Sequence, residues 1–219
     1  AGRLMHVDLD TRDVRELDRT ESSFDYGFED IAWSSGGRYI AYTYYDARNL
    51  RRVAIYDTQD ARKVTVTTGK FESFAPAFSA EGDWLYFISN RNFNASPGSP
   101  WGDRNMGPAF QSRGQIFAVQ LDPSAAFPFD APSELAEADE ASEEDESETE
   151  AEFEIVFDGI ADRLFQVPVG SGDFGALAAT GKHLFVYSFG DSNALQRVAI
   201  TSQDPSLSDY ASNVQRFGL

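Results

Sequence analysis

The stretch IAWSSGGRYIAY at residues 31–42 occurs in similar form twice more, as PAFSAEGDWLYF at 76–87 and GALAATGKHLFVY at 175–187. In each copy a large apolar residue stands four positions before a glycine, and a dense apolar run follows the glycine. The apolar residues are Trp33, Phe78 and Leu177, and the glycines are Gly37, Gly82 and Gly181. A glycine with a positive φ between two apolar segments predicts strand, tight turn and strand. Three copies in register favour a repeat architecture over an antiparallel sandwich with accidental similarity.

A second module follows the first one. VAIYDTQDARKVTVTT at 53–68 is similar to VDLDTRDVRELDRT at 7–20. This match aligns Asp57 with Asp10 and Asp60 with Asp13. The module predicts a third strand, a polar turn and a fourth strand. A second strand that is apolar on both faces must be covered on both sides, and radially stacked blades provide that cover.

The repeat length also indicates a β-propeller. Gly37 and Gly82 are 45 residues apart, which is within the range of one four-stranded blade. The sequence therefore predicts an all-β fold of about three to four blades, each of four antiparallel strands, in an incomplete ring. The expected segments are the end of one blade at 1–29, a blade at 30–70, a blade at 71–170 and an incomplete blade at 171–219. Because known propellers close with about four or more blades, we expect the missing blades to lie outside this sequence.

Two insertions interrupt the blade at 71–170, one at 90–114 and an acidic one at 122–152. Twelve carboxylates and no basic residue lie between Glu134 and Glu154, against a net charge of −18 for the whole chain. Without these twelve carboxylates, the chain has 24 acidic and 18 basic residues. So charged a segment is predicted to be a solvated loop. The acidic balance also argues against nucleic acid as a partner.

The composition offers few residues of the types that carry out catalysis. The chain has no cysteine, which excludes disulfides and thiolate metal sites, and it has two histidines, His6 and His183. Both histidines fall at expected strand positions, and no G-x-S-x-G elbow is present. The run Asp8, Asp10, Asp13 lacks the glycine and distal glutamate of a calcium loop, so a turn role is expected. We predict no catalytic residue, no metal site and no cofactor.

The sequence does not assign a compartment. No stretch approaches the roughly 18 apolar residues of a membrane helix, so no membrane insertion is expected. The N-terminus shows no basic-then-apolar signal pattern. A soluble protein is expected, either cytoplasmic or periplasmic.

The insertion at 90–114 contains the best candidates for binding. It combines cationic and aromatic side chains, and we assign a substrate-guiding role to Arg91, Phe93, Trp101, Arg104 and Arg113. Guanidinium groups and aromatic rings hold peptides by stacking and by pairing with a terminal carboxylate. The alternative is a loop that packs on its own propeller or on a neighbouring domain.

The repeats and one further segment resemble tricorn-type proteases. DIAWSSGGRYIAY and FESFAPAFSAEGDWLYF resemble the W/F-S-P-D-G-K-x-L-x-F theme of that family, although Ser35-Gly36 and Ala80-Glu81 stand where Pro-Asp is usual. More specifically, Asp158, Gly159, Ile160 and Arg163 match a D-G-I-x-x-R motif that precedes a V/F-P-V strand, here with Pro168 and Val169. The resemblance extends from about residue 4 to 200.

The resemblance implies a role for the chain. Tricorn-type enzymes are large hexameric serine proteases in which two propellers precede a catalytic region, and the second, seven-bladed propeller is thought to pass peptides. The chain resembles the latter part of that second propeller, so it is expected to be non-catalytic and to guide or gate peptides. Its expected partners are peptides or unfolded polypeptide, the remaining domains of the protease, and further copies of the same protein. Two alternatives are a TolB-like interaction module and the propeller of a prolyl-oligopeptidase-type enzyme.

Overall fold

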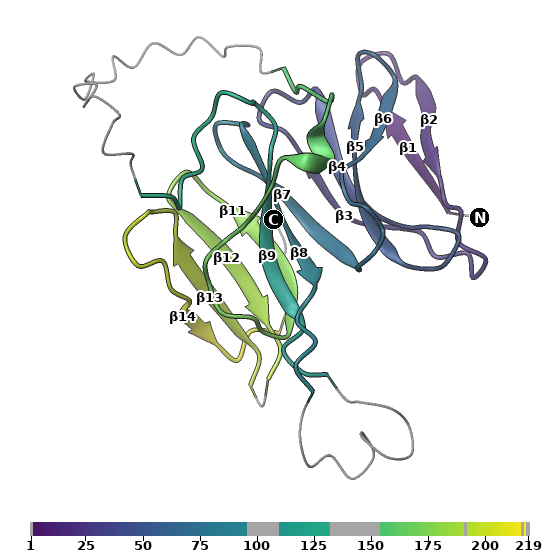
Figure 1. Ribbon diagram of the computed structural model, residues 1–219. Helices are drawn as coiled ribbons and strands as arrows, with labels where there is room; N and C mark the ends of the chain where they lie inside the picture. Colours follow the sequence, from purple (N-terminus) through teal and green to yellow (C-terminus); the bar gives the residue numbers. More distant parts are fainter. Residues whose placement is uncertain (1, 96–109, 132–153, 191, 216, 218–219) are drawn as a thin grey trace.

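The computed structural model describes residues 2–95, 110–131, 154–190, 192–215 and 217 (Figure 1). These residues form one two-stranded and three four-stranded antiparallel sheets. The two-stranded sheet contains β1 (Arg3–Val7) and β2 (Val14–Arg19). Blade 1 contains β3 (Phe28–Trp33), β4 (Tyr39–Tyr45), β5 (Arg51–Asp57) and β6 (Arg62–Thr65). Blade 2 contains β7 (Ser73–Phe78), β8 (Trp84–Asn90), β9 (Gly114–Gln120) and β10 (Leu164–Gln166). Blade 3 contains β11 (Phe174–Ala179), β12 (His183–Ser188), β13 (Ala194–Ala199) and β14 (Ser208–Ser212).

The sheets are arranged as propeller blades. In each blade the strands follow one another in sequence order, and the first strands lie side by side, with β7 in contact with both β3 and β11 (Figure 1). The sheets in the described part of the chain do not close into a ring. This confirms the predicted all-β fold of four-stranded blades in an incomplete ring.

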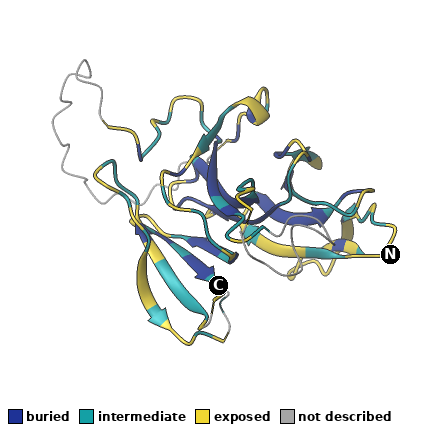
Figure 2. Cartoon of the chain, turned by 60° about the horizontal axis from the view of Figure 1, so that its bottom comes forward, coloured by how far each residue is buried: buried dark blue, intermediate teal, exposed yellow. Residues whose placement is uncertain are grey.

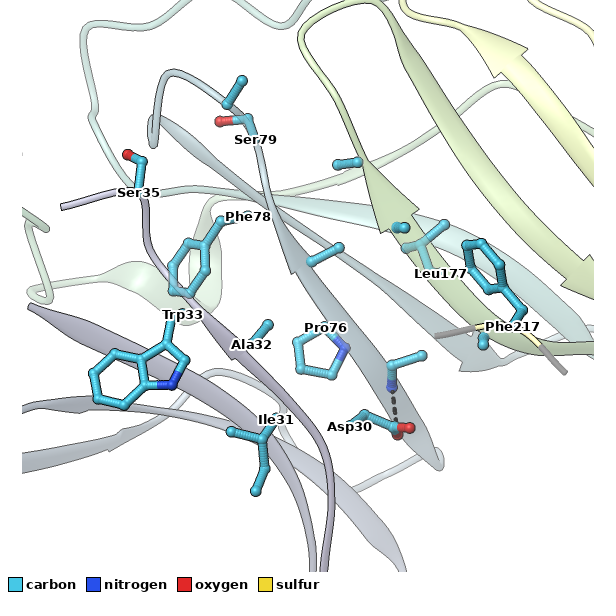
Figure 3. A pocket seen from close by; sticks show the side chains of 16 residues that line it. Asp30, Ile31, Ala32, Trp33, Ser35, Pro76, Phe78, Ser79, Leu177 and Phe217 are labelled. Carbon is cyan, nitrogen blue, oxygen red and sulfur yellow. Dashed lines mark hydrogen bonds between the residues drawn. The ribbon is translucent and has the colours of Figure 1, made fainter. Parts of the chain in front are cut away.

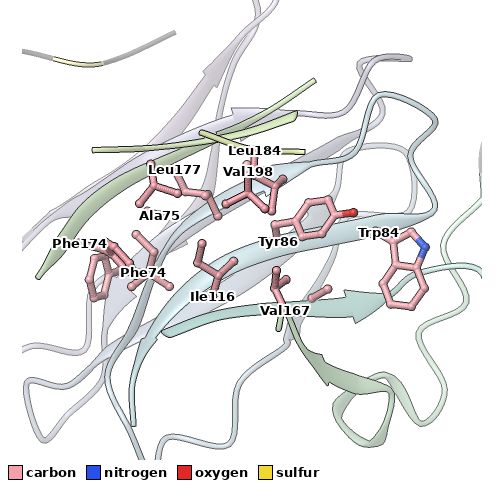
Figure 4. Close-up of a cluster of buried hydrophobic side chains, with 14 of the residues drawn as sticks. Phe74, Ala75, Trp84, Tyr86, Ile116, Val167, Phe174, Leu177, Leu184 and Val198 are labelled. Carbon is pink, nitrogen blue, oxygen red and sulfur yellow. The ribbon is translucent and has the colours of Figure 1, made fainter. Parts of the chain in front are cut away.

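The hydrophobic core lies between neighbouring blades. One buried cluster joins blades 2 and 3 through Phe74, Trp84 and Leu184, whose side chains come from opposite sheets (Figure 4). A second cluster joins blades 1 and 2, and a third joins the two-stranded sheet to blade 1. The second strands of blades 1 and 2, β4 and β8, are therefore buried on both faces, whereas β2 and β14 are largely exposed (Figure 2). The apolar runs after each glycine are explained by this double burial.

Hydroxyl groups fix the turn between the first two strands of each blade. The Ser34 and Ser79 hydroxyls accept hydrogen bonds from the amides of Tyr39 and Trp84 at 3.1 Å. Gly37 and Gly82 in these turns have φ of 70° and 85°, as the sequence predicted.

The third copy of this turn differs. Thr180 replaces the serine and makes the same two contacts, its amide donating to the carbonyl of His183 at 2.9 Å and its hydroxyl accepting from the amide of His183 at 3.1 Å, but the partner is three rather than five residues further along the chain. The loop of blade 3 is therefore shorter, and Gly181 does not have a positive φ. The prediction of a left-handed glycine was wrong at this position.

An aspartate shapes the turn between the third and fourth strands. Oδ1 of Asp57 accepts hydrogen bonds from the amides of Gln59 and Asp60. Oδ1 of Asp8 accepts in the same way from the amides two and three residues later. Asp57 therefore corresponds to Asp8, and the predicted match with Asp10 was displaced by two residues. The sequence comparison could not see this, because the match depends on which carboxylate folds back onto its own turn.

A buried ion pair adds to this turn in blade 1. Asp57 is 1% exposed, and its carboxylate accepts a 2.8 Å hydrogen bond from Nη2 of Arg38. Burial raises the pKa of Asp57, but hydrogen bonds from Arg38 and from the amides of Asp60 and Gln59 outweigh it and lower the pKa. Ionised Asp57 therefore stabilises the folded state above the unfolded pKa of about 4.

We expect Asp57→Asn to destabilise the protein at pH 7 by about 1–3 kcal/mol, because the variant loses a charged partner of Arg38. The difference from the wild type should shrink as the pH falls below about 4, where Asp57 of the unfolded state takes up a proton first, and it should disappear once the lowered pKa of folded Asp57 is passed as well. Urea unfolding between pH 7 and pH 3 measures this difference. Asp10→Asn, at an exposed position in the other turn, is the control and should change little. A difference that is independent of pH would contradict the assignment.

The segment after the acidic insertion is clamped by an arginine. The guanidinium of Arg163 donates hydrogen bonds to the carbonyls of Gln120, Val156 and Asp158. Between these contacts Gly159 has a φ of 68°, and the 3-10 helix η1 (Ile160–Asp162) begins with Ile160 buried in the core. The D-G-I-x-x-R motif therefore returns the chain to blade 2, where β10 pairs with β9 as the predicted fourth strand.

The structure describes the first part of the insertion at 122–152. Residues 122–131 pack on blade 2, where the ring centroid of Phe127 lies 5.2 Å from that of Trp84, and Phe129 is buried. Because the segment carries two phenylalanines that fill the end of the core, it belongs to the folded part. The charged residues at 132–153 lie outside the described residues.

Candidate functional site

The first strands of the three blades line a pocket of about 640 Å³ (Figure 3). Its wall is mainly apolar and contains several alanines from β3, β7 and β11. Ile31 and Trp33 from β3 are about half exposed, at 52% and 48%. In Figure 3 Pro76 and Phe78 of β7 lie between these β3 residues and Leu177 of β11. Small side chains beside a few large apolar ones leave room for a ligand along the three strands.

Asp30 is the charged residue in this wall, and it joins two blades. Its Oδ2 accepts a hydrogen bond from the amide of Ala75 in β7 at 3.0 Å (Figure 3) and another from the hydroxyl of Thr43 in β4 at 2.9 Å. Asp30 and Ala75 have positive φ of 50° and 54°, where the pairing of β3 and β7 with their partners shifts. These are β-bulges, which redirect strands next to binding sites. The carboxylate is therefore engaged in holding the wall together.

We expect Asp30→Ala to destabilise the contact between blades 1 and 2 by about 1–2 kcal/mol, because the buried amide of Ala75 keeps only its 3.2 Å bond to Thr43. Amide hydrogen exchange at Ala75 should become faster. Asp30→Asn keeps an oxygen acceptor and should retain most of the protection. If Asp30→Ala leaves the exchange of Ala75 unchanged, the carboxylate does not hold the two blades together.

The predicted guiding residue Arg91 is packed within blade 2. Its guanidinium carbon lies 4.1 Å from the ring centre of Phe117 and 5.1 Å from that of Phe71. Its Nε donates a 3.0 Å hydrogen bond to the hydroxyl of Ser89, and burial lowers the pKa of the guanidinium. These contacts are those of a side chain that supports the base of the insertion. They fit the alternative in which this loop packs on its own propeller.

Phe93 and Arg113 lie together at the base of the same insertion. Phe93 is 47% exposed, its ring makes edge contact with Phe110 at 5.6 Å, and the guanidinium carbon of Arg113 lies 5.7 Å from its centre. Arg91 reaches the same cluster through Phe71, which lies 5.9 Å from Phe93. Trp101 and Arg104 lie outside the described residues. The structure thus brings three of the five predicted residues together.

A second pocket, of about 310 Å³, opens next to this cluster. It is lined by Arg51, Asn90 and Arg113 from blades 1 and 2, and by Asp173, Phe174 and Phe189 from blade 3. The backbones of Gly114 and Gly172 form two hydrogen bonds at its floor, of 2.8 and 2.9 Å. A Cβ at Gly114 would lie 2.8 Å from the carbonyl oxygen of Gly172, so this close approach requires glycine.

Both histidines are strand residues. His6 lies in β1 and accepts a hydrogen bond from Nε of Arg15, and His183 pairs with Ala199 in blade 3. Within the described ranges, no group of three or more His, Cys, Asp or Glu side chains is placed to hold a metal ion. The same ranges contain no helix that is long and apolar enough to cross a membrane.

Sequence reasoning missed most of the residues that line the two pockets. In the sequence, the apolar residues of the first pocket looked like ordinary core residues. A local apolar pattern does not show whether a strand residue packs in the core or lines the inner face of the ring. Arg51 and Asp173 lie more than a hundred residues apart and carry no shared motif. The repeat itself could have indicated the first pocket, since equivalent positions of first strands must lie side by side in stacked blades.

Comparison with known proteins identifies the family. The model of the tricorn protease second beta propeller domain matches residues 1–216. Tricorn protease homolog 1 of Streptomyces coelicolor is 25% identical over 183 residues, and the match covers 81% of this chain and 16% of that protein. The tricorn protease of Thermoplasma volcanium is 29% identical over 100 residues, covering 43% of this chain and 9% of that protein. The chain therefore spans a small part of the relatives that it matches.

Solved structures agree on the fold. The crystal structure of the tricorn protease matches with a TM-score of 0.75 at 20% identity, over 99% of this chain and 21% of that one. TolB from Acinetobacter baumannii matches with a TM-score of 0.54 at 15% identity, over 94% of this chain and 37% of that one. At these identities the likeness concerns the propeller fold alone. The match of the family model over nearly the whole length shows that this chain belongs to the tricorn protease second beta propeller domain family.

Proposed function

We propose that this chain is a non-catalytic part of a tricorn-like serine protease that guides or gates peptides toward a catalytic region outside the chain. The family membership supports the protease, and the apolar pocket along β3, β7 and β11 is the observation that supports a guiding role. First strands of propeller blades face the central channel. A wall of alanines with a few large apolar side chains can accept an extended peptide without selecting one sequence.

The proposal assigns different roles to the predicted residues. Phe93 and Arg113, at the base of the 90–114 insertion, would contact peptides, whereas Arg91 would support them through Phe71. By analogy with the family, the partners would be peptides or unfolded polypeptide, the other domains of the protease, and further copies in a hexamer. In this proposal peptide hydrolysis takes place in the other domains of the protease.

The test is peptide turnover by the full-length protein with Ile31→Glu. Ile31 is half exposed in the pocket wall, so the variant should fold, but a carboxylate there disfavours apolar peptide segments. We expect kcat/KM for peptides of about ten residues to fall several-fold. Leu9→Glu, which places the same charge at an 88% exposed position in the β1–β2 turn, is the matched control.

Unchanged turnover in Ile31→Glu would contradict the guiding role. TolB-like matches support a second candidate, a protein-interaction module. That candidate predicts that the full-length protein hydrolyses no peptide, or that turnover is insensitive to every substitution in the wall. Measuring hydrolysis by the wild type first separates these outcomes.

A further inference from the structure

We propose that the 310 Å³ pocket at the junction of the three blades binds a carboxylate group of a peptide, with Arg113 as its principal ligand. The inference rests on the proposed function for the class of ligand. The pocket takes residues from the start of β5, the ends of the β8–β9 connection and the start of β11. Arg113 connects the pocket to the aromatic cluster, because its guanidinium carbon lies 5.7 Å from the ring centre of the exposed Phe93, which makes edge contact with Phe110.

Arg113 is the cation in this pocket for which the described residues supply no acceptor. None of the carboxylates in the described ranges forms an ion pair with it, and no group in those ranges accepts a hydrogen bond from its buried Nε. Buried donors of folded proteins are nearly always satisfied, by protein groups, water or a ligand. An unpaired guanidinium that lines a pocket is therefore a place where an added acceptor gains hydrogen bonds without breaking existing ones.

The other charged groups of the pocket are already engaged. Nε of Arg51 lies 3.5 Å from Oε1 of Glu72, and its guanidinium carbon lies 3.8 Å above the ring of Phe74. Oδ1 of Asp173 accepts a 2.7 Å hydrogen bond from the amide of Ser112. Asn90 donates to Oε2 of Glu72 at 3.1 Å. Arg113 thus remains the group whose charge is unmatched, although Asp173 will weaken the attraction for an anion.

The chemistry of the pocket fits a carboxylate on a small organic group. A guanidinium presents a planar fork that matches the two oxygens of a carboxylate. Phe74, Phe174 and Phe189 form apolar walls around it, so the rest of the ligand can bury apolar surface. The volume lies at the lower end of the range for ligand pockets, which suits one or two residues of a peptide. Such a carboxylate comes either from a peptide C-terminus or from an Asp or Glu side chain.

The experiment measures the binding of labelled peptides to the full-length protein by fluorescence anisotropy. Three protease-resistant tripeptides of D-amino acids, labelled at the N-terminus, serve as probes: one with a free C-terminus, its C-terminal amide, and an amide that carries one glutamate. We expect the carboxylate-bearing probe to bind about tenfold more tightly than the plain amide, as for a charge-assisted hydrogen bond. The glutamate-bearing amide identifies which source of carboxylate is used.

Arg113→Gln should remove this preference, and Arg48→Gln should keep it, because Arg48 is an exposed arginine on the neighbouring β4–β5 connection. Arg113→Lys keeps the charge without the fork and should give an intermediate preference; it also serves if Arg113→Gln does not fold. Equal binding of all three probes, or a preference that survives Arg113→Gln, would overturn the inference. The anisotropy readout does not depend on turnover, so it remains valid if Ile31→Glu shows that the guiding role is wrong.

Discussion

Replacing Trp84 with alanine should destabilise the propeller by about 3–5 kcal/mol, the cost of emptying a large aromatic site in a core. Trp84 is 1% exposed and begins β8, the strand at the centre of the described structure. Its ring centroid lies 5.2 Å from that of Phe127, in the first part of the acidic insertion, and 5.3 Å from that of Phe165, in the strand β10 that follows the insertion. The substitution would therefore loosen both ends of the insertion as well as the contact between blades 2 and 3.

Two further variants make this prediction specific. Nε1 of Trp84 is buried without a hydrogen-bond partner, so Trp84→Phe removes an unsatisfied donor while keeping an aromatic ring. We expect it to cost less than about 1.5 kcal/mol. Trp33→Ala, at a half-exposed site, should stay within about 1 kcal/mol of the wild type. Urea unfolding measures all three variants. Similar losses in Trp84→Ala and Trp33→Ala would show that Trp84 is not a centre of the core.

Replacing Arg163 with methionine should release the segment that closes the acidic insertion. The variant keeps a long apolar stem but loses the donors to the carbonyls of Gln120, Val156 and Asp158. Because those carbonyls are partly accessible to water, the expected cost is about 2–3 kcal/mol rather than the full sum of three charged hydrogen bonds. Hydrogen exchange and limited proteolysis at 154–163 should increase before the rest of the propeller opens.

Arg163→Lys separates charge from geometry. A lysine ammonium cannot reach three carbonyls as the planar guanidinium does, so it should recover only part of the loss. The exposed Arg197→Met in β13 is the matched control and should change local exchange little. If residues 154–163 of Arg163→Met resist hydrogen exchange and proteolysis as well as those of the wild type do, Arg163 does not hold this segment in place. The D-G-I-x-x-R motif then serves another purpose.

Local sequence features predicted the blades well because each blade is built from neighbouring segments. The glycine turns at Gly37 and Gly82 and the apolar runs after them depend on interactions within one hairpin. The glycine turns and apolar strands that the repeat predicts therefore coincide with the turns and buried strands of the structure. The same locality explains the errors. The conformation of Gly181 depends on the length of one turn. The match of Asp57 depends on which carboxylate accepts hydrogen bonds from its own turn, and sequence similarity reveals neither property.

The candidate sites were less predictable than the fold. Of the residues assigned to peptide guidance, Arg91 and Arg113 looked equivalent in the sequence. The structure packs the first between Phe71 and Phe117, whereas the second lies at the edge of a pocket and finds no acceptor among the described residues. Which role an arginine has depends on what the neighbouring blade brings next to it.

The sequence by itself determined that this protein is built of repeated four-stranded blades, because the repeat of glycine turn and apolar strand is a local property of each blade. It also carried the D-G-I-x-x-R motif by which the family resemblance was noticed. Only the tertiary structure decided which side chains meet between blades: the carboxylate of Asp30 with the amide of Ala75, and Arg51 with Arg113 and Asp173 around one pocket. Those contacts join segments far apart in the chain, and stacking rather than local pattern brings them together.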